Sequence, residues 1–166
     1  MTTLVRDFCS TDIEPLTKLY NRYIIETTIT FDLSPFSVEQ RQANWMCHYN
    51  HSGRYRLFVA ESDGEVVGYA SSSKLRTKAA YNTSVESSIY LCDKAQGKGI
   101  GKQLYSTLFQ TLAQEDIHRV YAGITLPNQA SIALHKKFDF EQVGLFREVG
   151  RKFGRYWDVA WFEKTM

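Results

Sequence analysis

The sequence predicts one mixed α+β domain, in which helices cover both faces of a central β-sheet. Short apolar strand segments alternate with segments of helical spacing along all 166 residues. No internal repeat, low-complexity segment or linker divides the chain, so a single domain spanning residues 1–166 is expected. The 43% hydrophobic and 23% charged content is that of an ordinary soluble globular protein.

Strands are expected where short runs of apolar and β-branched residues occur. These runs are Leu4–Phe8, Tyr55–Glu61, Glu65–Ser73, Ser84–Leu91, His118–Ile124, Glu141–Val149 and Trp157–Phe162. Ser62-Asp63-Gly64 is a hairpin signal between the second and third runs. The polar segment Lys74–Asn82 is expected to be a loop, and Gly150–Arg155 a basic turn between the last two strands.

Helices are expected where apolar residues recur at three- and four-residue spacing. Asp12 is a candidate N-cap for a helix running to Ile24, and Thr27–Asp32 then forms an ordered loop. Ser37 and Gln40 have capping-box spacing and should open a second helix that runs through Tyr49. The other two helices carry Leu104, Leu108 and Leu112, and Asn128–Phe138, respectively.

The formal net charge of +2 is too small to indicate nucleic acid or an anionic membrane as partner. Cys9, Cys47 and Cys92 form an odd set without CxxC spacing, which argues against a disulfide framework or a structural zinc site. His48 and His51 lack acidic or cysteine companions, so no metal is expected. With no signal peptide in residues 1–10 and no apolar run of about 20 residues, we expect a cytoplasmic protein.

A glycine-rich loop lies between the expected strand at 84–91 and the following helix. Its residues are Gln96, Gly97, Lys98, Gly99, Ile100, Gly101 and Lys102. Glycines let the backbone approach a ligand closely, and the first N–H groups of a helix attract anions. The loop is one residue too short for a Walker motif, and its glycine spacing does not fit a dinucleotide fingerprint. It does fit Q/R-x-x-G-x-G/A, although an ordinary helix-entry turn is the simpler alternative.

With this loop, and with Leu126-Pro127-Asn128-Gln129-Ala130-Ser131 and Leu134-His135 downstream, the sequence resembles the GNAT superfamily of N-acetyltransferases. The resemblance implies a mostly antiparallel sheet in which a splayed pair of strands holds acetyl-CoA as cosubstrate. The loop would bind the pyrophosphate, and the backbone of Ile89, Tyr90 and Leu91 the pantetheine arm. Asn128 and Ser131 would line the other side of the cofactor, although Asn128 can also serve as a helix cap.

Within the superfamily, the chain resembles the phosphinothricin and methionine sulfone acetyltransferase branch from about residue 3 onward. The supporting segments are Tyr23–Thr28 with Phe31, Val85–Leu91 and Lys152–Val159. The resemblance implies acetylation of the α-amine of a small amino-acid-like acceptor, commonly by a homodimer. Where several relatives have tryptophan before an arginine, this chain has Leu75 before Arg76. The resemblance therefore does not define the shape of the acceptor pocket.

Glu86 is the candidate general base for removing a proton from the acceptor ammonium, with a role as a substrate anchor as the alternative. His135 is the candidate that supports the departing sulfur or relays protons, or it is a structural helix residue. The candidate acceptor-binding residues are Glu26, Phe31, Lys74, Arg76, Glu86 and Ser87. Arg76, helped by Lys74, can bind a carboxylate or phosphinate with paired hydrogen bonds, or it is a solvated surface charge.

Two other functions stay open. The same fold could acetylate a polyamine, an aminoglycoside or a peptide N-terminus, but the cations at 74–78 favour an anionic acceptor. Alternatively, the chain could be a non-catalytic acyl-CoA-binding sensor, against which Glu86 argues. The C-terminal strand from Tyr156 to Phe162 could pair across a two-fold axis or lie inside one sheet.

Overall fold

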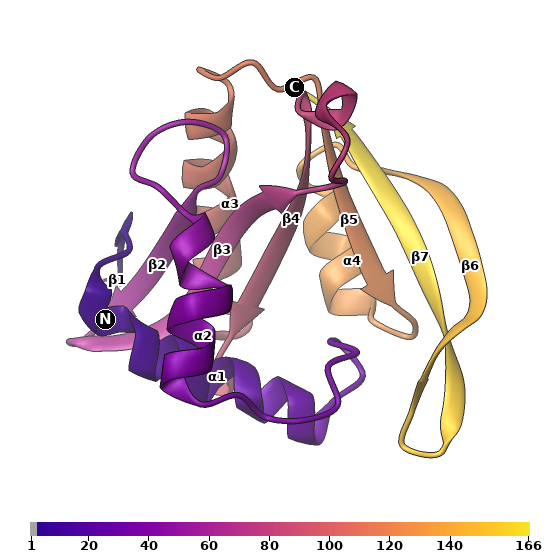
Figure 1. The fold of residues 1–166 in the computed structure, drawn as a ribbon, viewed down its shortest axis with the longest axis horizontal. Helices are drawn as coiled ribbons and strands as arrows, with labels where there is room; N and C mark the ends of the chain where they lie inside the picture. The colour runs from indigo at the N-terminus through magenta and orange to yellow at the C-terminus, as the bar shows by residue number, and fades with distance from the viewer. Residues whose placement is uncertain (1–2) are drawn as a thin grey trace.

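A computed structural model describes residues 3–166, and its order of strands and helices is that expected from the sequence (Figure 1). The strands are β1 Thr3–Asp7, β2 Leu57–Ser62, β3 Glu65–Lys74, β4 Ser84–Leu91, β5 Arg119–Thr125, β6 Glu141–Lys152 and β7 Arg155–Thr165. The helices are α1 Ile13–Glu26, α2 Val38–Asn44, α3 Ile100–Leu112 and α4 Gln129–Lys136. The first two residues of the expected domain, Met1 and Thr2, lie outside the described residues. No described helix is long and apolar enough to cross a membrane.

The strands form one sheet in the order β1-β2-β3-β4-β5-β7-β6. Neighbouring strands run antiparallel except β4 and β5, which are parallel. That parallel pairing covers only Ser84–Glu86 against Arg119–Tyr121, and Figure 1 shows the two strands diverging beyond it. The expected mostly antiparallel sheet with one splayed pair is therefore confirmed. β7 lies inside the sheet, between β5 and the edge strand β6.

The sheet separates two apolar cores, as the alternation of strand side chains requires. On one face, Phe58 and Ala60 of β2 pack with the apolar stripe of α3. On the other face, Leu57 and Val59 pack with α1. β2 thus contributes alternate side chains to both cores. Helices cover both faces of the sheet, as the expected three-layer arrangement requires.

The local signals placed the elements correctly but missed some of their ends. Ser37 and Gln40 form the expected capping box, with Ser37 N–H donating to Gln40 Oε1 at 2.8 Å. The helix they open ends at Asn44, because the chain tightens into a 3₁₀ turn over residues 46–48 and does not continue helical to Tyr49. The basic turn is also shorter than expected. It is centred on Phe153 and Gly154, both at positive φ, because β6 and β7 extend beyond the sheet as a mostly exposed hairpin that tolerates charged residues.

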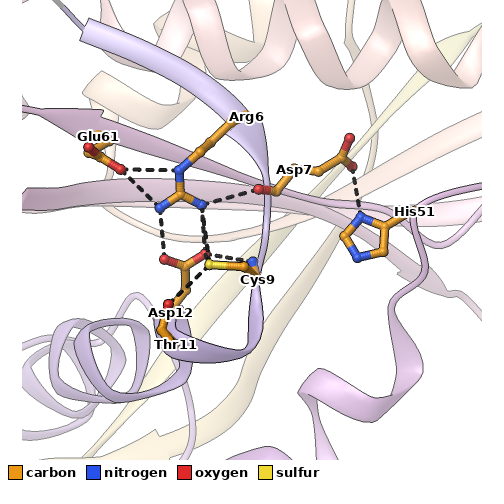
Figure 2. A network of polar contacts seen from close by, with 7 residues as sticks. All are labelled: Arg6, Asp7, Cys9, Thr11, Asp12, His51 and Glu61. Carbon is orange, nitrogen blue, oxygen red and sulfur yellow. Dashed lines mark hydrogen bonds and ion pairs between the residues drawn. The ribbon is translucent and has the colours of Figure 1, made fainter. Parts of the chain in front are cut away.

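Asp12 has the expected position before α1, but its carboxylate does not cap that helix. It accepts two hydrogen bonds from the Arg6 guanidinium, at 2.8 and 2.9 Å, and one from the Cys9 backbone N–H at 2.8 Å. Figure 2 shows Arg6 bridging Asp12 and Glu61, whose Oε2 accepts from Arg6 Nη2 at 3.0 Å. This network ties β1 to β2 and to the start of α1. Burial alone would raise the pKa of Asp12, but the bonds from Arg6 and Cys9 lower it on balance.

We expect Arg6→Met to lower the free energy of unfolding by about 1–3 kcal/mol, because it leaves the buried Asp12 carboxylate without its cation. The lowered pKa of Asp12 sets the pH dependence. The stabilisation is present above the unfolded-state carboxyl pKa, near ~3.9, and is lost as pH falls through the folded-state value. Urea unfolding of both proteins at neutral and acidic pH measures this difference.

Arg22→Met is the matched control, because Arg22 pairs with Glu26 and Asp93, which are both largely exposed. It should leave the unfolding free energy nearly unchanged. Equal effects of the two substitutions would contradict the role given to the Arg6 network.

Candidate active site

The divergence of β4 and β5 opens a cavity of about 440 Å³, here called the central pocket. Its walls include Glu86–Tyr90 of β4, Ala122–Thr125 of β5, and Asn128, Ser131 and His135 at the start and along α4. Phe31, from the loop between α1 and α2, lines the same pocket. The splayed strands therefore bring together residues that lie more than 100 positions apart in the sequence.

A second cavity, of about 390 Å³, adjoins the central pocket at the start of α3 and is called the glycine-loop pocket. Of the predicted cofactor residues, it is lined by Ile89, Leu91, Gln96, Gly97, Gly99, Gly101, Lys102, Asn128 and Ser131. Ile89, Asn128 and Ser131 also line the central pocket. The two predicted blocks, the glycine loop and the start of α4, thus face each other across one continuous cavity.

The glycines of this loop are required by its geometry. Gly99 is the N-cap of α3 and has a φ of 79°, in the left-handed region where other residues are strained. A Cβ at Gly101 would lie 3.3 Å from Leu134 Cδ2 and 3.4 Å from Leu91 Cδ1. The first turn of α3 can therefore approach α4 and β4 closely, with its free N–H groups at the cavity.

Three of the predicted cofactor residues do not line the glycine-loop pocket with their side chains. Ile100 is buried in the core under α3. Lys98 instead lines a small cavity with Glu65 and Lys94. The Tyr90 ring faces away from the glycine loop and packs against Tyr69 at a centroid distance of 5.2 Å. Ile100 can therefore contribute only through its backbone at the start of α3, and the backbone of Tyr90 pairs with Tyr69 of β3.

Asn128 is the N-cap of α4, which was the alternative to a role in binding the cofactor. Its side-chain oxygen accepts from Ser131 N–H at 3.1 Å, which satisfies one of the free N–H groups at the start of α4. Asn128 lines both pockets at the same time, so capping and contact with a ligand are compatible.

The backbone of Leu91 has a partner that the sequence did not reveal. The Tyr23 hydroxyl donates to the Leu91 carbonyl at 2.6 Å and lies 3.4 Å from its N–H. It thus satisfies backbone groups of Leu91 on the edge of β4 that is opposite β3. Tyr23 also lines the glycine-loop pocket, at the position where the resemblance predicts the pantetheine arm.

Glu86 lies at the last residue of the β4–β5 pairing and lines the central pocket. Burial raises the pKa of its carboxyl group above the ordinary value, and the nearby positive charge of Arg76 offsets part of this rise. A carboxylate with a raised pKa inside a cavity is suited to accept a proton near neutral pH.

His135 is 3% exposed and is held from two sides. Its Nδ1 lies 2.8 Å from the Ser131 carbonyl oxygen, and its Nε2 lies 2.9 Å from the Tyr105 hydroxyl. A carbonyl only accepts, so the network assigns the proton to Nδ1, and Nε2 accepts from Tyr105. Burial lowers the pKa of His135, which favours the neutral ring, and raises that of Tyr105.

A third and larger cavity, of about 620 Å³, lies on the α1 side of the sheet and is called the aromatic pocket. It shares Ser88 and Tyr90 with the central pocket, so the two cavities adjoin along β4. Its lining residues come from α1, the α1–α2 loop, α2, the segment after it, β3 and β4: Tyr20, Asp32, Phe36, Gln40, Arg41, Asn44, Trp45, His48, Tyr49, Tyr55, Tyr69, Ser71, Ser73, Lys74, Ser88 and Tyr90.

The loop between α1 and α2 closes this region against the β6–β7 hairpin. The buried Lys152 ammonium donates to the Thr30 carbonyl at 2.8 Å. Phe31 packs directly on Gly150, where an added Cβ would lie 2.1 Å from Phe31 Cε2. Phe31 can occupy this position only because residue 150 has no side chain.

The predicted acceptor residues fall in different places. Phe31, Glu86 and Ser87 line the central pocket, and Lys74 lines the aromatic pocket. Arg76 is exposed, and its Nη1 donates to the Leu75 carbonyl at 3.0 Å. Glu26 pairs with Arg22 on the outside of α1, with 2.8 Å between Glu26 Oε2 and Arg22 Nε.

Sequence reasoning missed Tyr105, Tyr23 and Arg41. Tyr105 follows Leu104 on the apolar stripe of α3, and a phenol in such a stripe usually needs a buried partner, which was the available signal. Arg41 is buried, although nothing in the sequence of α2 predicts that an arginine at this position is buried. No group of three or more His, Cys, Asp or Glu side chains in residues 3–166 is placed to hold a metal ion.

Comparison with known proteins gives a family match over most of the chain. The family model described as "Acetyltransferase (GNAT) domain" matches residues 5–161. A phosphinothricin N-acetyltransferase of Streptomyces coelicolor is 53% identical over 164 residues, which cover 98% of this chain and 95% of that protein. An L-methionine sulfoximine/L-methionine sulfone acetyltransferase of Pseudomonas paraeruginosa is 33% identical over 166 residues, covering 100% and 96%.

A solved structure also matches the chain along its whole length. It is a GNAT superfamily phosphinothricin acetyltransferase from Sinorhizobium meliloti in complex with acetyl-CoA. The two structures agree with a TM-score of 0.91 at 33% sequence identity, over 100% of this chain and 89% of that one.

Proposed function

This chain belongs to the GNAT acetyltransferase family, and on that basis we propose that it acetylates the α-amine of a small amino-acid-like acceptor. The proposed acceptors are of the phosphinothricin, methionine sulfoximine or methionine sulfone type, and acetyl-CoA is the donor. One observation carries the proposal most directly. Glu86 lines a central pocket that shares walls with the glycine-loop pocket on one side and with the aromatic pocket on the other.

The glycine-loop pocket is the proposed site of acetyl-CoA. The first turn of α3 offers N–H groups to the pyrophosphate, Lys102 adds a positive charge, and Gly101 permits close approach. The pantetheine arm would run along the free edge of β4 beside Ile89 and Leu91, as an added strand. The thioester would then lie in the central pocket, which Glu86 also lines.

Transfer is proposed to be direct, with Glu86 as the general base. The acceptor ammonium first gives a proton to the Glu86 carboxylate, directly or through a water molecule. The amine nitrogen then attacks the thioester carbonyl carbon, a C–N bond forms, and the C–S bond breaks with its electron pair on sulfur. Backbone N–H groups along the free edge of β4 are candidates for stabilising the oxyanion that develops in between.

His135 and Tyr105 are proposed to support the departing sulfur. Tyr105 lines the central pocket and keeps its proton because burial raises its pKa. In the structure His135 Nε2 accepts that O–H, and His135 itself lines the pocket. Rotation of the O–H toward the sulfur would let Tyr105 stabilise the leaving thiolate by a hydrogen bond while it keeps its proton, and the proton that neutralises the thiolate comes from the attacking nitrogen, which loses its second proton as the amide forms. His135 keeps its own proton at Nδ1 on the Ser131 carbonyl, so it positions the phenol and does not donate.

Free-thiol release from acetyl-CoA against a panel of amines tests the proposed function. The panel holds phosphinothricin, methionine sulfoximine, methionine sulfone, the common amino acids, spermidine, an aminoglycoside and a peptide with a free N-terminus. We expect turnover confined to the small anionic amino-acid-like acceptors. Turnover only with cationic amines or the peptide would refute the acceptor class while keeping the family. Acetyl-CoA binding without any turnover would refute the enzyme.

We expect Glu86→Gln to lower kcat by about 10²–10⁴-fold while leaving acetyl-CoA affinity nearly unchanged. Because burial raises the pKa of Glu86, the fall of wild-type kcat/KM on the acid side should come at a pH above the ordinary glutamate value of about 4.3. Glu141→Gln on the exposed face of β6 is the matched control and should have wild-type activity. Equal turnover in Glu86→Gln would remove this assignment.

A homodimer is proposed from the apolar surface of the β6–β7 hairpin. Val143, Phe153 and Tyr156 are each more than half exposed there, and Leu145 and Phe146 lie on the same edge strand. We expect Val143→Glu to shift the protein from dimer to monomer in sedimentation velocity. Leu4→Glu, at an exposed apolar position on the opposite edge strand β1, is the control. A wild type that sediments as a monomer would contradict the proposal.

A further inference from the structure

Arg41 lies in the wall of the aromatic pocket and is the most deeply buried cation there. Only 5% of its surface is exposed, and its guanidinium carbon lies 3.7 Å from the centroid of the Trp45 ring and 4.2 Å from that of Tyr20. The two rings hold the guanidinium in place through cation–π contacts. The orientation of Arg41 is therefore fixed by its surroundings before any ligand binds.

Arg41 lacks a carboxylate partner, although the Tyr69 hydroxyl lies close enough to interact with it. Within residues 3–166, no carboxylate lies within ion-pair distance of it, and its buried Nε and Nη2 donate to nothing. Asp32 lines the same pocket, but its carboxylate accepts from the Tyr20 hydroxyl at 2.5 Å. A buried guanidinium with unused donors is costly unless an acceptor comes to it.

Arg56 shows that this is not the usual state of a buried arginine in this protein. It is 8% exposed and also lies over an aromatic ring, that of Phe58, at 5.0 Å. Its Nη2, however, donates to the Asp7 carboxylate at 2.8 Å. Arg56 is paired and lies outside the aromatic pocket, whereas Arg41 is unpaired and lines it.

The strand register places Arg41 at a useful distance from Glu86. Trp45 packs on Tyr69 and Tyr20 packs on Tyr90, and Tyr69 is the cross-strand neighbour of Tyr90. Arg41 contacts the two rings that pack on this pair, and Tyr90 is four residues along β4 from Glu86, which corresponds to about 13 Å between the Cα atoms of Glu86 and Tyr90. Arg41 and Glu86 therefore lie toward opposite ends of this stretch of β4.

An amino acid fits this gap in only one direction. Its side-chain head-group atom at the δ position lies four bonds from the α-nitrogen, or roughly 5 Å when extended. Its α-carboxylate is two bonds from the same nitrogen and is too close to the amine to reach Arg41 while the amine is at Glu86. The exposed cations Lys74 and Arg76 lie on the Glu86 side of the pocket and remain available for that carboxylate.

We propose that the Arg41 guanidinium is the subsite for the oxygen-bearing side-chain end of the acceptor, a phosphinate, sulfonyl or carboxylate group. A planar guanidinium binds two oxygens on one atom with paired hydrogen bonds. This inference rests on the proposed function. It makes Arg41 the residue that separates acceptors with oxidised side chains from those with apolar side chains of the same length.

The test compares methionine sulfone with methionine, which differ only by the two oxygens on sulfur. In the wild type, kcat/KM should favour the sulfone. Arg41→Met should lower the ratio of the two kcat/KM values at least tenfold, and Arg41→Lys, which keeps the charge without the paired donors, should lower it by less. The KM for acetyl-CoA should not change in either variant.

Arg56→Lys and Arg56→Met are the matched controls for loss of a buried arginine. They should leave the acceptor ratio at the wild-type value even where they lower Tm. An unchanged ratio in Arg41→Met, or an equal loss with both acceptors, would overturn the proposal. If Arg41→Met does not fold, the same criteria apply to Arg41→Lys.

Thermal shift separates failure of this inference from failure of the proposed function. With CoA present, methionine sulfone should raise the Tm of the wild type more than methionine does, and Arg41→Lys should reduce that difference. A sulfone-specific shift that depends on Arg41 without turnover would keep the subsite and refute the proposed reaction. Turnover with a sulfone preference that is the same in Arg41→Lys and wild type would keep the proposed reaction and refute the Arg41 subsite.

Discussion

The short parallel pairing of β4 and β5 is the constraint on which the rest of the site depends. Three residues of each strand are in register, ending at Glu86 and Tyr121, and the strands then part inside an otherwise antiparallel sheet. Parting leaves backbone donors and acceptors unpaired on an interior edge, which a fold tolerates only if something else satisfies them. The Tyr23 hydroxyl does this for Leu91, and the remaining edge faces the cavities. The opening is thus part of the sheet's construction and needs no domain movement.

β4 also separates the two sides of the site. Glu86, Ser88 and Tyr90 alternate with Ser87 and Ile89, so that one set faces α1 and the other faces α3 and α4. Because β3 pairs with β4 from Val85 to Leu91, both sets of side chains are carried by one backbone that is held along its length. The distance between a group bound beside the glycine loop and one bound in the aromatic pocket is therefore determined by the pleat of a single strand.

Local sequence signals predicted those parts of the molecule that local chemistry determines. The bounds of β4 were predicted to the residue, and the glycine loop was identified because Gly99 must adopt a positive φ. Asp12 was predicted to cap α1 because its position fits. Its carboxylate bonds to Arg6 because β1 happens to bring a guanidinium there, and no local pattern encodes that choice. The same holds for Arg41, whose burial follows from the rings of distant elements.

The hydrogen bond from Lys152 to Thr30 joins positions that are 122 residues apart. Closing so long a segment costs conformational entropy that only the completed sheet can offset, since β7 must first insert between β5 and β6. The wall that Phe31 forms against Gly150 is therefore assembled late, after the glycine loop and α3 have packed on β2 and β3. Every residue that lines the aromatic pocket precedes β5, so a newly made chain would hold that pocket's residues well before those of β6 and β7 that complete the central pocket.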